Sequence, residues 1–276
     1  MSLYTVTGGR GFIGSHIVAL LESQGHEVYV PTRNDENLFS RNLGTVIYCA
    51  GNGDCQRTPF AVLEANTLLL SQILQKAQFN KLVYISSTRV YMNHATASEQ
   101  DDVIVCNDDN RRLFNLTKLV AEEMCLKSGK PVTIVRPSNV YGLALNSPLF
   151  LPSIIRHAIN NGEVNMYVQP TYAKDYVSVD DVAEVCVKLA QTDGVEGKVF
   201  NIAAGENTDA GQIADVLEKL TACNINWHKV QFPREVFPVT SIDALREIYP
   251  EYQPRNVLTD LVYMINKYKE ELNKSA

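Results

Sequence analysis

The sequence has 276 residues, of which 45% are hydrophobic and 20% charged, so it can form one large α/β domain or one domain with a small lobe. Lys and Arg number 25 and Asp and Glu 31, and the net charge of −6 argues against a nucleic-acid backbone or an anionic membrane as the main partner. No apolar run reaches the ~20 residues of a membrane-spanning helix, no signal-peptide pattern is present and the six cysteines include no C-x-x-C pair, so we expect a cytoplasmic protein with free thiols and a small-molecule partner.

Short apolar runs alternate with stretches of helical period along the chain, which is the pattern of βαβ units around a mostly parallel sheet. Only 15 residues separate Val30 from Val46, too few for a complete first half, so one βα unit is expected to be missing after the second strand. Residues 92–110 are polar and acidic and predict an exposed loop or flap. The predicted strands are 4–6, 27–30, 45–48, 81–85, 132–135 and 198–202, and the predicted helices are 13–23, 60–76, 111–127, 179–191, 209–220 and 258–272.

A glycine-rich turn at residues 7–14 follows the first predicted strand and opens the first predicted helix. A dinucleotide pyrophosphate site requires this placement, because glycines let the backbone approach the anion and the helix N-terminus offers free N–H donors. A turn that binds nothing is the alternative. The predicted cofactor contacts in the turn are Gly8, Gly9, Arg10, Gly11, Phe12, Ile13 and Gly14.

The G-x-x-G-x-x-G spacing of this turn resembles the extended short-chain dehydrogenase/reductase family, which includes nucleotide-sugar epimerases, dehydratases and reductases. The stretches 46–51, 83–91, 136–142, 174–182 and 200–205 also fall in the family's order. The resemblance implies a Rossmann-type doubly wound parallel sheet, shortened after strand 2, with a small C-terminal substrate lobe. It assigns residues 1–142 and 174–205 to an NAD(P)-binding domain and residues 143–173 and 206–276 to the substrate lobe. Further cofactor contacts implied by it are Ala50, Gly51, Asn66, Lys118 and Pro137.

The end of the second predicted strand carries Thr32, Arg33 and Asn34, where an NAD enzyme usually has Asp or Glu to hold the ribose. Arg33 can pair with a 2′-phosphate or stack on adenine, so NADP is favoured over NAD and these three residues are predicted cofactor contacts. A solvated surface arginine is the alternative, and Asp35 and Glu36 could still reach the ribose.

In the resembled family a tyrosine transfers the proton, a lysine four residues later lowers the pKa of that tyrosine and holds the ribose, and a serine binds the reacting oxygen. Residues four apart share a helix face, and an ammonium beside a phenol favours the phenolate. Ser87 and Lys118 match the serine and lysine positions, but Phe114 stands at the tyrosine position and has no ionisable oxygen. No tyrosine occurs between Tyr91 and Tyr141, so a shifted alignment does not restore the motif.

Three interpretations of Phe114 stay open. In the favoured one, the chain is an NAD(P)-dependent nucleotide-sugar oxidoreductase or epimerase in which water or another group relays the proton. In the second, it is a catalytically silent NAD(P)-binding sensor or scaffold. In the third, the phenylalanine is an engineered replacement that traps substrate. The groups considered for the proton relay are Tyr91, Cys106, Asp108 and Tyr141.

The residues after Ser87 argue against one reaction of the resembled family and include a predicted substrate contact. Thr88 and Arg89 stand where dehydratases of the resembled family carry an Asp-Glu pair, so 4,6-dehydration is not expected. The resemblance implies that Thr88, Asn139 and Arg234 bind the substrate, with an ordinary turn asparagine and a surface salt bridge as the alternatives for the last two.

The other polar residues considered for a functional role have simpler structural explanations. Asp180 and Asp181 precede an apolar helix, where carboxylates favour the positive end of the helix dipole. The scattered histidines lack a second ligand at helical spacing, so no metal site is expected. Helices 60–76 and 111–127 correspond to those that form a dimer interface in the resembled family, so a homodimer is expected, although burial within one chain explains the same apolar residues.

Overall fold

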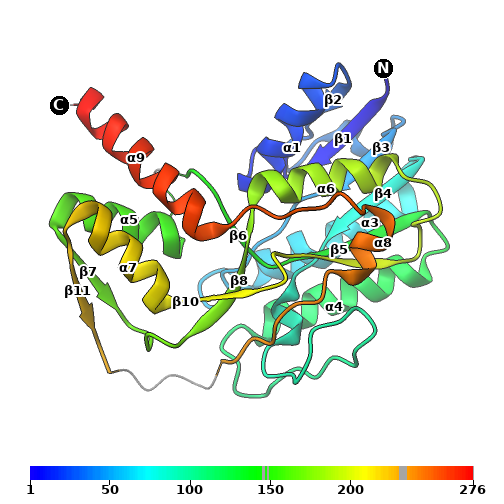
Figure 1. Ribbon diagram of the computed structural model, residues 1–276. Coiled ribbons are helices and arrows are strands. Elements are labelled where there is room, and N and C mark those ends of the chain that lie inside the picture. Colours follow the sequence, from blue (N-terminus) through cyan, green and yellow to red (C-terminus); the bar gives the residue numbers. More distant parts are fainter. Residues whose placement is uncertain (145–146, 148, 230–234, 276) are drawn as a thin grey trace.

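The computed structural model describes residues 1–144, 147, 149–229 and 235–275, and its centre is a parallel sheet of six strands in the order β2-β1-β3-β4-β5-β9. Helices cover both faces of this sheet (Figure 1), which confirms the predicted doubly wound α/β fold of Rossmann type. Every predicted strand is present within two residues of its expected ends. The strands are β1 (Leu3–Thr7), β2 (Glu27–Tyr29), β3 (Thr45–Tyr48), β4 (Lys81–Ile85), β5 (Val132–Pro137) and β9 (Val199–Ile202).

Each face of the large sheet carries its own hydrophobic core, because successive side chains of a strand point to opposite faces. Val83 of β4 belongs to the core beneath α1 and α6, and Leu82, one residue earlier, belongs to the core beneath α3 and α4. Strands that are buried on both faces are apolar along their whole length, which explains why they were recognisable in the sequence. The four helices are α1 (Phe12–Ser23), α3 (Leu69–Lys76), α4 (Arg112–Lys127) and α6 (Val179–Gln191).

Strand β2 forms one edge of the sheet, and none of the described residues adds a strand beyond it. Between β2 and β3 the described chain contains a single short 3-10 turn, Glu36–Phe39, capped by the Asp35 side chain, which accepts from the Asn37 N–H at 3.1 Å. The predicted shortening after the second strand is therefore confirmed. As a consequence, residues 32–34 follow an edge strand and are exposed.

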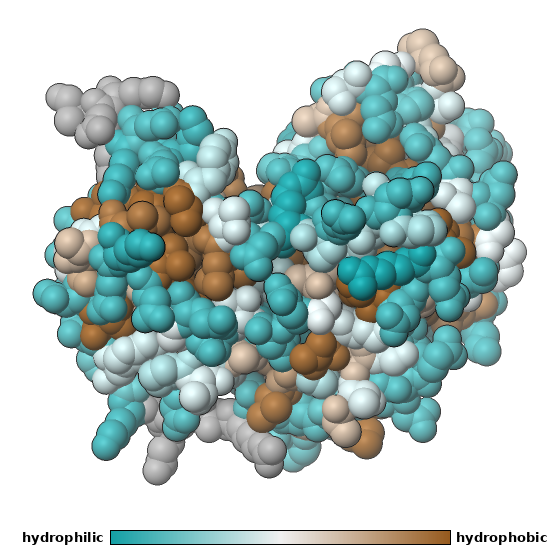
Figure 2. Space-filling model, in the orientation of Figure 1, coloured by the Kyte–Doolittle hydropathy of each residue, from teal (hydrophilic) through white to brown (hydrophobic). Residues whose placement is uncertain are grey.

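A third hydrophobic core lies outside the large sheet and joins helices α5, α7 and α9. These helices lie together on the side of the molecule away from β1 and β2 (Figure 1), and a notch separates them from the part that carries α1 in the space-filling view (Figure 2). None of the described helices is long and apolar enough to cross a membrane. The lobe contains α5 (Phe150–Asn161), β7 (Glu163–Met166), α7 (Ala210–Thr221), β11 (Asn224–Trp227) and α9 (Val257–Ser275), and β6 (Asn139–Tyr141), β8 (Ala173–Ser178) and β10 (Asn207–Asp209) form a small sheet beside it.

Two segments depart from the expectation of a C-terminal stretch confined to the lobe and of an exposed loop at residues 92–110. Helix α8 (Asp243–Ile248) comes from the C-terminal stretch, yet its Leu245 packs in the core of the large sheet. Residues 92–110 contain no helix or strand, as predicted, but the loop is anchored rather than simply exposed, because Ala97 is buried and forms a bridge with Thr240.

Candidate active site

A cavity of about 630 Å³ lies at the carboxyl ends of β1, β3, β4 and β5, the edge at which open α/β sheets bind ligands. The large sheet contributes the glycine-rich turn and the residues that follow its strands, the lobe contributes side chains of α5, and the small sheet contributes side chains of β8. The cavity therefore lies where the lobe meets the large sheet. The sequence-predicted residues that line it are Gly8, Gly11, Phe12, Ile13, Gly14, Gly51, Ser87, Phe114, Lys118, Pro137 and Asn139.

Lys118 is buried in the wall of this cavity, on the second turn of α4. Its ammonium donates a hydrogen bond to the Ile85 carbonyl oxygen at 2.7 Å, so the last residue of β4 fixes its position. Burial lowers the pKa of Lys118 to about 8, and the nearby Glu122 carboxylate opposes that shift. Lys118 is thus a cation held at the strand ends at a substantial desolvation cost.

Ser87 stands just after β4 and caps the short 3-10 turn Thr88–Tyr91, accepting a hydrogen bond from the Arg89 N–H at 3.1 Å. Its hydroxyl lines the cavity, and its proton has no acceptor among the hydrogen bonds of the described residues. The serine can therefore donate to an oxygen placed in the cavity. Phe114 faces the same space, so the described wall offers an aromatic ring without an oxygen at this point.

The four groups considered for a proton relay are not available for it in this structure. Tyr91 is buried, and its hydroxyl donates to Asn201 at 3.0 Å and accepts from Arg136 at 2.6 Å. Tyr141 lines the cavity, but its hydroxyl donates to the Asp260 carboxylate at 2.8 Å, and burial followed by that carboxylate raises its pKa. Cys106 and Asp108, on the anchored loop, lie outside the described lining.

Arg89, at the position where an acid would serve dehydration, is engaged in buried ion pairs. Its guanidinium donates to Asp109 at 2.7 Å and to Glu235 at 2.9 Å. Thr88 is buried in the same 3-10 turn and does not line the cavity. These two positions therefore present no acid–base pair to a ligand.

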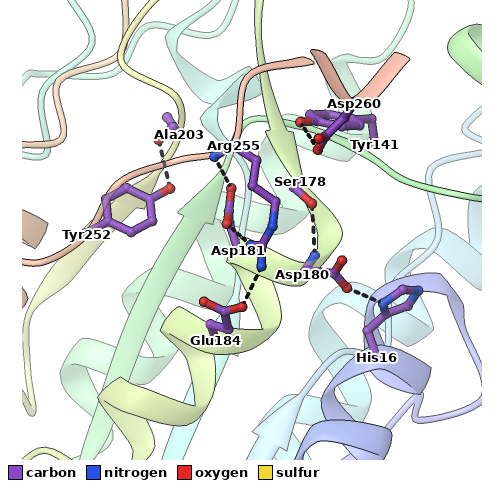
Figure 3. Close-up of polar contacts among 10 residues, drawn as sticks. All are labelled: His16, Tyr141, Ser178, Asp180, Asp181, Glu184, Ala203, Tyr252, Arg255 and Asp260. Carbon is purple, nitrogen blue, oxygen red and sulfur yellow. Dashed lines mark hydrogen bonds and ion pairs between the residues drawn. The ribbon is translucent and has the colours of Figure 1, made fainter. Parts of the chain in front are cut away.

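Asp180 and Asp181 have the structural roles that the sequence predicted. Figure 3 shows the Ser178 side chain capping α6 through the Asp180 N–H, while the Asp180 carboxylate contacts His16 at 2.8 Å. The Asp181 carboxylate pairs with Arg255, whose guanidinium also contacts Glu184 at 2.8 Å. Within the described residues, no group of three or more His, Cys, Asp or Glu side chains could hold a metal ion.

Comparison with known proteins identifies the family, since residues 4–203 match the NAD dependent epimerase/dehydratase family. The chain belongs to this family. The UDP-N-acetyl-alpha-D-glucosaminuronate decarboxylase of Bacillus cytotoxicus is 24% identical over 272 residues, which cover 84% of each chain. The structure of MoeE5 in complex with UDP-glucose and NAD matches with a TM-score of 0.85 at 21% identity, over 98% of this chain and 99% of that one. RMD from Pseudomonas aeruginosa complexed with NADPH matches with a TM-score of 0.80 at 20% identity, over 98% of this chain and 100% of that one.

The glycine-rich turn of this family member fits a dinucleotide pyrophosphate. Gly8 has φ +73°, and a Cβ there would lie 2.7 Å from the Ala50 nitrogen. A Cβ at Gly14 would lie 2.3 Å from the Gly8 carbonyl oxygen. Because no side chain can occupy this space, the backbone N–H groups at the start of α1 stay open to an anion.

Several predicted contact residues lie behind or beside the cavity rather than in its lining. Asn66 is buried in the π-helical segment Glu64–Leu68, which joins α2 (Pro59–Leu63) to α3. Its amide accepts from the Asn52 N–H at 3.0 Å and donates to Thr117 at 3.0 Å, so it braces the loop that carries Gly51. Gly9, Arg10, Thr32, Arg33, Asn34, Ala50 and Thr88 are also outside the lining, and the prediction for Arg234 falls outside the described residues.

The structure adds polar residues that the sequence reasoning did not select. Arg111 lies one turn before Phe114, Tyr172 enters the cavity from the lobe, and Lys174 enters it from β8 of the small sheet. Burial lowers the pKa of Lys174 to about 8, and its ammonium lies 4.8 Å from the Tyr172 ring centre. The one signal for Arg111 in the sequence is a pair of arginines opening a helix, where acidic residues are favoured.

Proposed function

We propose that this chain is an NAD(P)-dependent nucleotide-sugar oxidoreductase or epimerase, in which hydride passes between the nicotinamide and a sugar carbon. The observation that carries the proposal is that one cavity holds the glycine-rich turn, Ser87 and Lys118 together with side chains of the lobe. Several of its relatives are named for reactions of nucleotide sugars, among them a decarboxylase, a reductase and a 4-epimerase, and MoeE5 binds UDP-glucose together with NAD.

The bound nicotinamide would supply the hydride acceptor or donor, and the protein would orient it. In this proposal the turn from Gly8 to Gly14 holds the pyrophosphate at the N-terminus of α1, and Lys118 holds the nicotinamide ribose. Arg33 favours NADP over NAD, because an exposed guanidinium next to an edge strand can pair with a 2′-phosphate. Residues 1–142 and 174–205 form the cofactor domain in this account, and 143–173 with 206–276 supply the substrate lobe.

Proton transfer at the reacting oxygen does not use residue 114, because phenylalanine has no exchangeable proton. We assign the oxygen contact to Ser87, whose hydroxyl can donate into the cavity, and the proton itself to water. Dehydration between sugar carbons is excluded from the proposal, because Arg89 is held by Asp109 and Glu235. The remaining chemistry is reduction of a keto-sugar or epimerisation through a keto intermediate.

The proposal includes a homodimer formed through α2 and α4. Leu116 and Val120 on α4 are 40% and 50% exposed, and Phe60 on α2 is 86% exposed. An apolar stripe that the single chain leaves uncovered favours a second copy as its cover.

Calorimetric titration of the purified chain with NADP+ and NAD+, and then with UDP-, dTDP- and GDP-sugars, tests the function. We expect binding of a cofactor and of at least one nucleotide sugar, with NADP+ tighter than NAD+. Arg33→Ser is expected to remove that difference, and Arg57→Ser, another exposed arginine, is the matched control. Cofactor binding without affinity for any nucleotide sugar would instead indicate a silent dinucleotide-binding protein.

A further inference from the structure

Arg111 places a guanidinium in the cavity without an anionic partner. Its side chain lines the cavity, and its Cζ atom lies 4.7 Å from the centre of the Phe114 ring. Among the residues that the structure describes, the guanidinium makes no hydrogen bond and no ion pair, and its contact is the aromatic face. A charged group that is partly withdrawn from water without a counter-ion is costly, so its placement requires an explanation.

The nearby carboxylates form no ion pair with the Arg111 side chain in the part of the chain that the structure describes, and other groups occupy them. Asp109 accepts hydrogen bonds from Arg89 at 2.7 Å, from the Asn115 amide at 2.8 Å and from the Arg111 backbone N–H at 2.8 Å. Glu235 accepts from Arg89 and from the Tyr172 hydroxyl. Asp109 thus fixes the Arg111 backbone at the start of α4 and leaves the Arg111 side chain free to reach the cavity.

The local structure of α4 gives no reason for an arginine at this position. Arg111 is the N-cap residue and Arg112 the first helical residue, and no acidic residue lies in the first turn. Positive charge at the positive end of a helix dipole is unfavourable. The two arginines also differ in placement, since Arg112 is exposed and contacts Asn107 at 2.8 Å, outside the cavity.

Arg111 lies at the end of the cavity where the sugar would react. Its guanidinium and the Lys118 ammonium approach the same Phe114 ring, at 4.7 and 5.8 Å from the ring centre. A Cβ on Gly53 would come within 3.0 Å of the Arg111 Nη2 atom, so the guanidinium lies against the loop that follows β3. Under the proposed function, the sugar carbon that reacts beside Lys118 lies away from the anomeric carbon, to which the diphosphate is attached.

We propose that Arg111 binds a carboxylate on the sugar, so that the substrate class is a nucleotide-linked uronic acid. The planar guanidinium matches a carboxylate with two parallel hydrogen bonds, which a point charge such as an ammonium does not. This inference rests on the proposed nucleotide-sugar function and adds the charge of the sugar to it. Arg111 has a binding role here, because a guanidinium stays protonated at working pH and cannot act as an acid or a base.

Calorimetry with UDP-glucuronate, UDP-glucose and UDP, in the presence of saturating cofactor, tests the inference. The parent protein is expected to bind UDP-glucuronate at least about tenfold more tightly than UDP-glucose, since a hydrogen bond to a charged group contributes about 1.5–3 kcal/mol. Arg111→Met keeps an apolar contact with Phe114 and should remove that preference while changing the affinity for UDP by less than about twofold. Arg111→Lys should restore part of it, and Arg112→Met is the matched control with no effect.

Comparing the three ligands distinguishes a failure of this inference from a failure of the proposed nucleotide-sugar function. If Arg111→Met weakens UDP as much as UDP-glucuronate, the arginine binds the diphosphate and the inference is wrong while the nucleotide-sugar function stands. If UDP-glucose and UDP-glucuronate bind equally to the parent and to Arg111→Met, the carboxylate is not recognised and the inference is again overturned. If none of the three binds, the proposed function fails, and this inference fails with it.

Discussion

The Lys118 ammonium lies 5.8 Å from the centre of the Phe114 ring, where the family resemblance places a phenol. Lys118 is buried and fixed by the Ile85 carbonyl, and Ser87 lines the same cavity. An ammonium in this position would favour the phenolate of a tyrosine beside it. By the family resemblance, the cavity has the lysine and the serine in place and lacks the phenol oxygen, and this proposed arrangement is the basis of the predictions below.

Gly14→Ala should weaken cofactor binding at least about tenfold, because its Cβ would lie 2.3 Å from the Gly8 carbonyl oxygen and force the turn to move. Calorimetry with NAD+ and NADP+ measures the loss. Ser15→Ala, an exposed position on the next residue of α1, should bind as the parent does. Unchanged affinity in Gly14→Ala would show that the turn does not hold the cofactor.

Glu122→Gln should lower the free energy of unfolding by about 3–5 kcal/mol, because it leaves the Arg136 guanidinium buried without its counter-charge. Glu122 accepts from Arg136 at 2.5 and 2.9 Å, and both side chains are buried. Urea unfolding followed by circular dichroism gives the value. Glu123→Gln, at the exposed neighbouring position, is the control, and equal stability of the two variants would contradict the prediction.

Lys118 should make the protein more stable as the pH rises from about 8 to about 10.5. Burial lowers its pKa from 10.5 to about 8, so between these values the unfolded chain binds a proton that the folded chain does not. The difference between the two pKa values corresponds to about 3 kcal/mol of unfolding free energy. Below pH 8 the burial of Lys118 lowers the free energy of unfolding by this full amount. The Lys118→Met variant should lose this rise in the free energy of unfolding.

Urea unfolding at pH 7 and at pH 10 measures the effect, with Lys127→Met, an exposed lysine at the end of the same helix, as control. Lys174, whose pKa burial also lowers, is present in every variant, so its contribution cancels in the comparison. If the free energy of unfolding of Lys118→Met depends on pH as that of Lys127→Met does, the burial of Lys118 is not the cause of the rise in stability.

Val120→Glu should convert the proposed homodimer into monomers, because it places a charge in the middle of the exposed apolar stripe of α4. Sedimentation velocity at micromolar concentration reads the change directly. Lys127→Glu alters charge on the same helix outside the stripe and should leave the dimer intact. A parent protein that sediments as a monomer would refute this part of the proposal.

The sequence predicted the large sheet well because its central strands are buried on both faces. Val83 and Leu82 serve opposite cores, and such runs stand out as continuous apolar segments. In the lobe, helices α7 and α9 are present as predicted, but α5 was not predicted. Helix α5 carries Pro152 in its first turn, where proline is tolerated, although the same residue indicates a break when only the sequence is read.

The residues that the large sheet contributes to the candidate site were predictable because they lie in short sequence motifs. Ser87 and Lys118 belong to local motifs, so spacing along the chain finds them. Tyr172 and Lys174 reach the cavity only because the lobe and the small sheet pack against the large sheet, which no local pattern encodes. Arg111 was overlooked because its role depends on which carboxylates are already occupied, and that is a property of the folded chain.

The most direct test of the central claim is hydride transfer by Phe114→Tyr, followed as reduced nicotinamide in single turnovers with bound cofactor and each nucleotide sugar that binds. Restoring the phenol beside Lys118 should accelerate the step by about 100-fold or more over the parent, the usual contribution of a positioned acid or base. Phe60→Tyr, an exposed site, should behave as the parent. An inert Phe114→Tyr protein that still binds both ligands would contradict the account of this cavity as an oxidoreductase site.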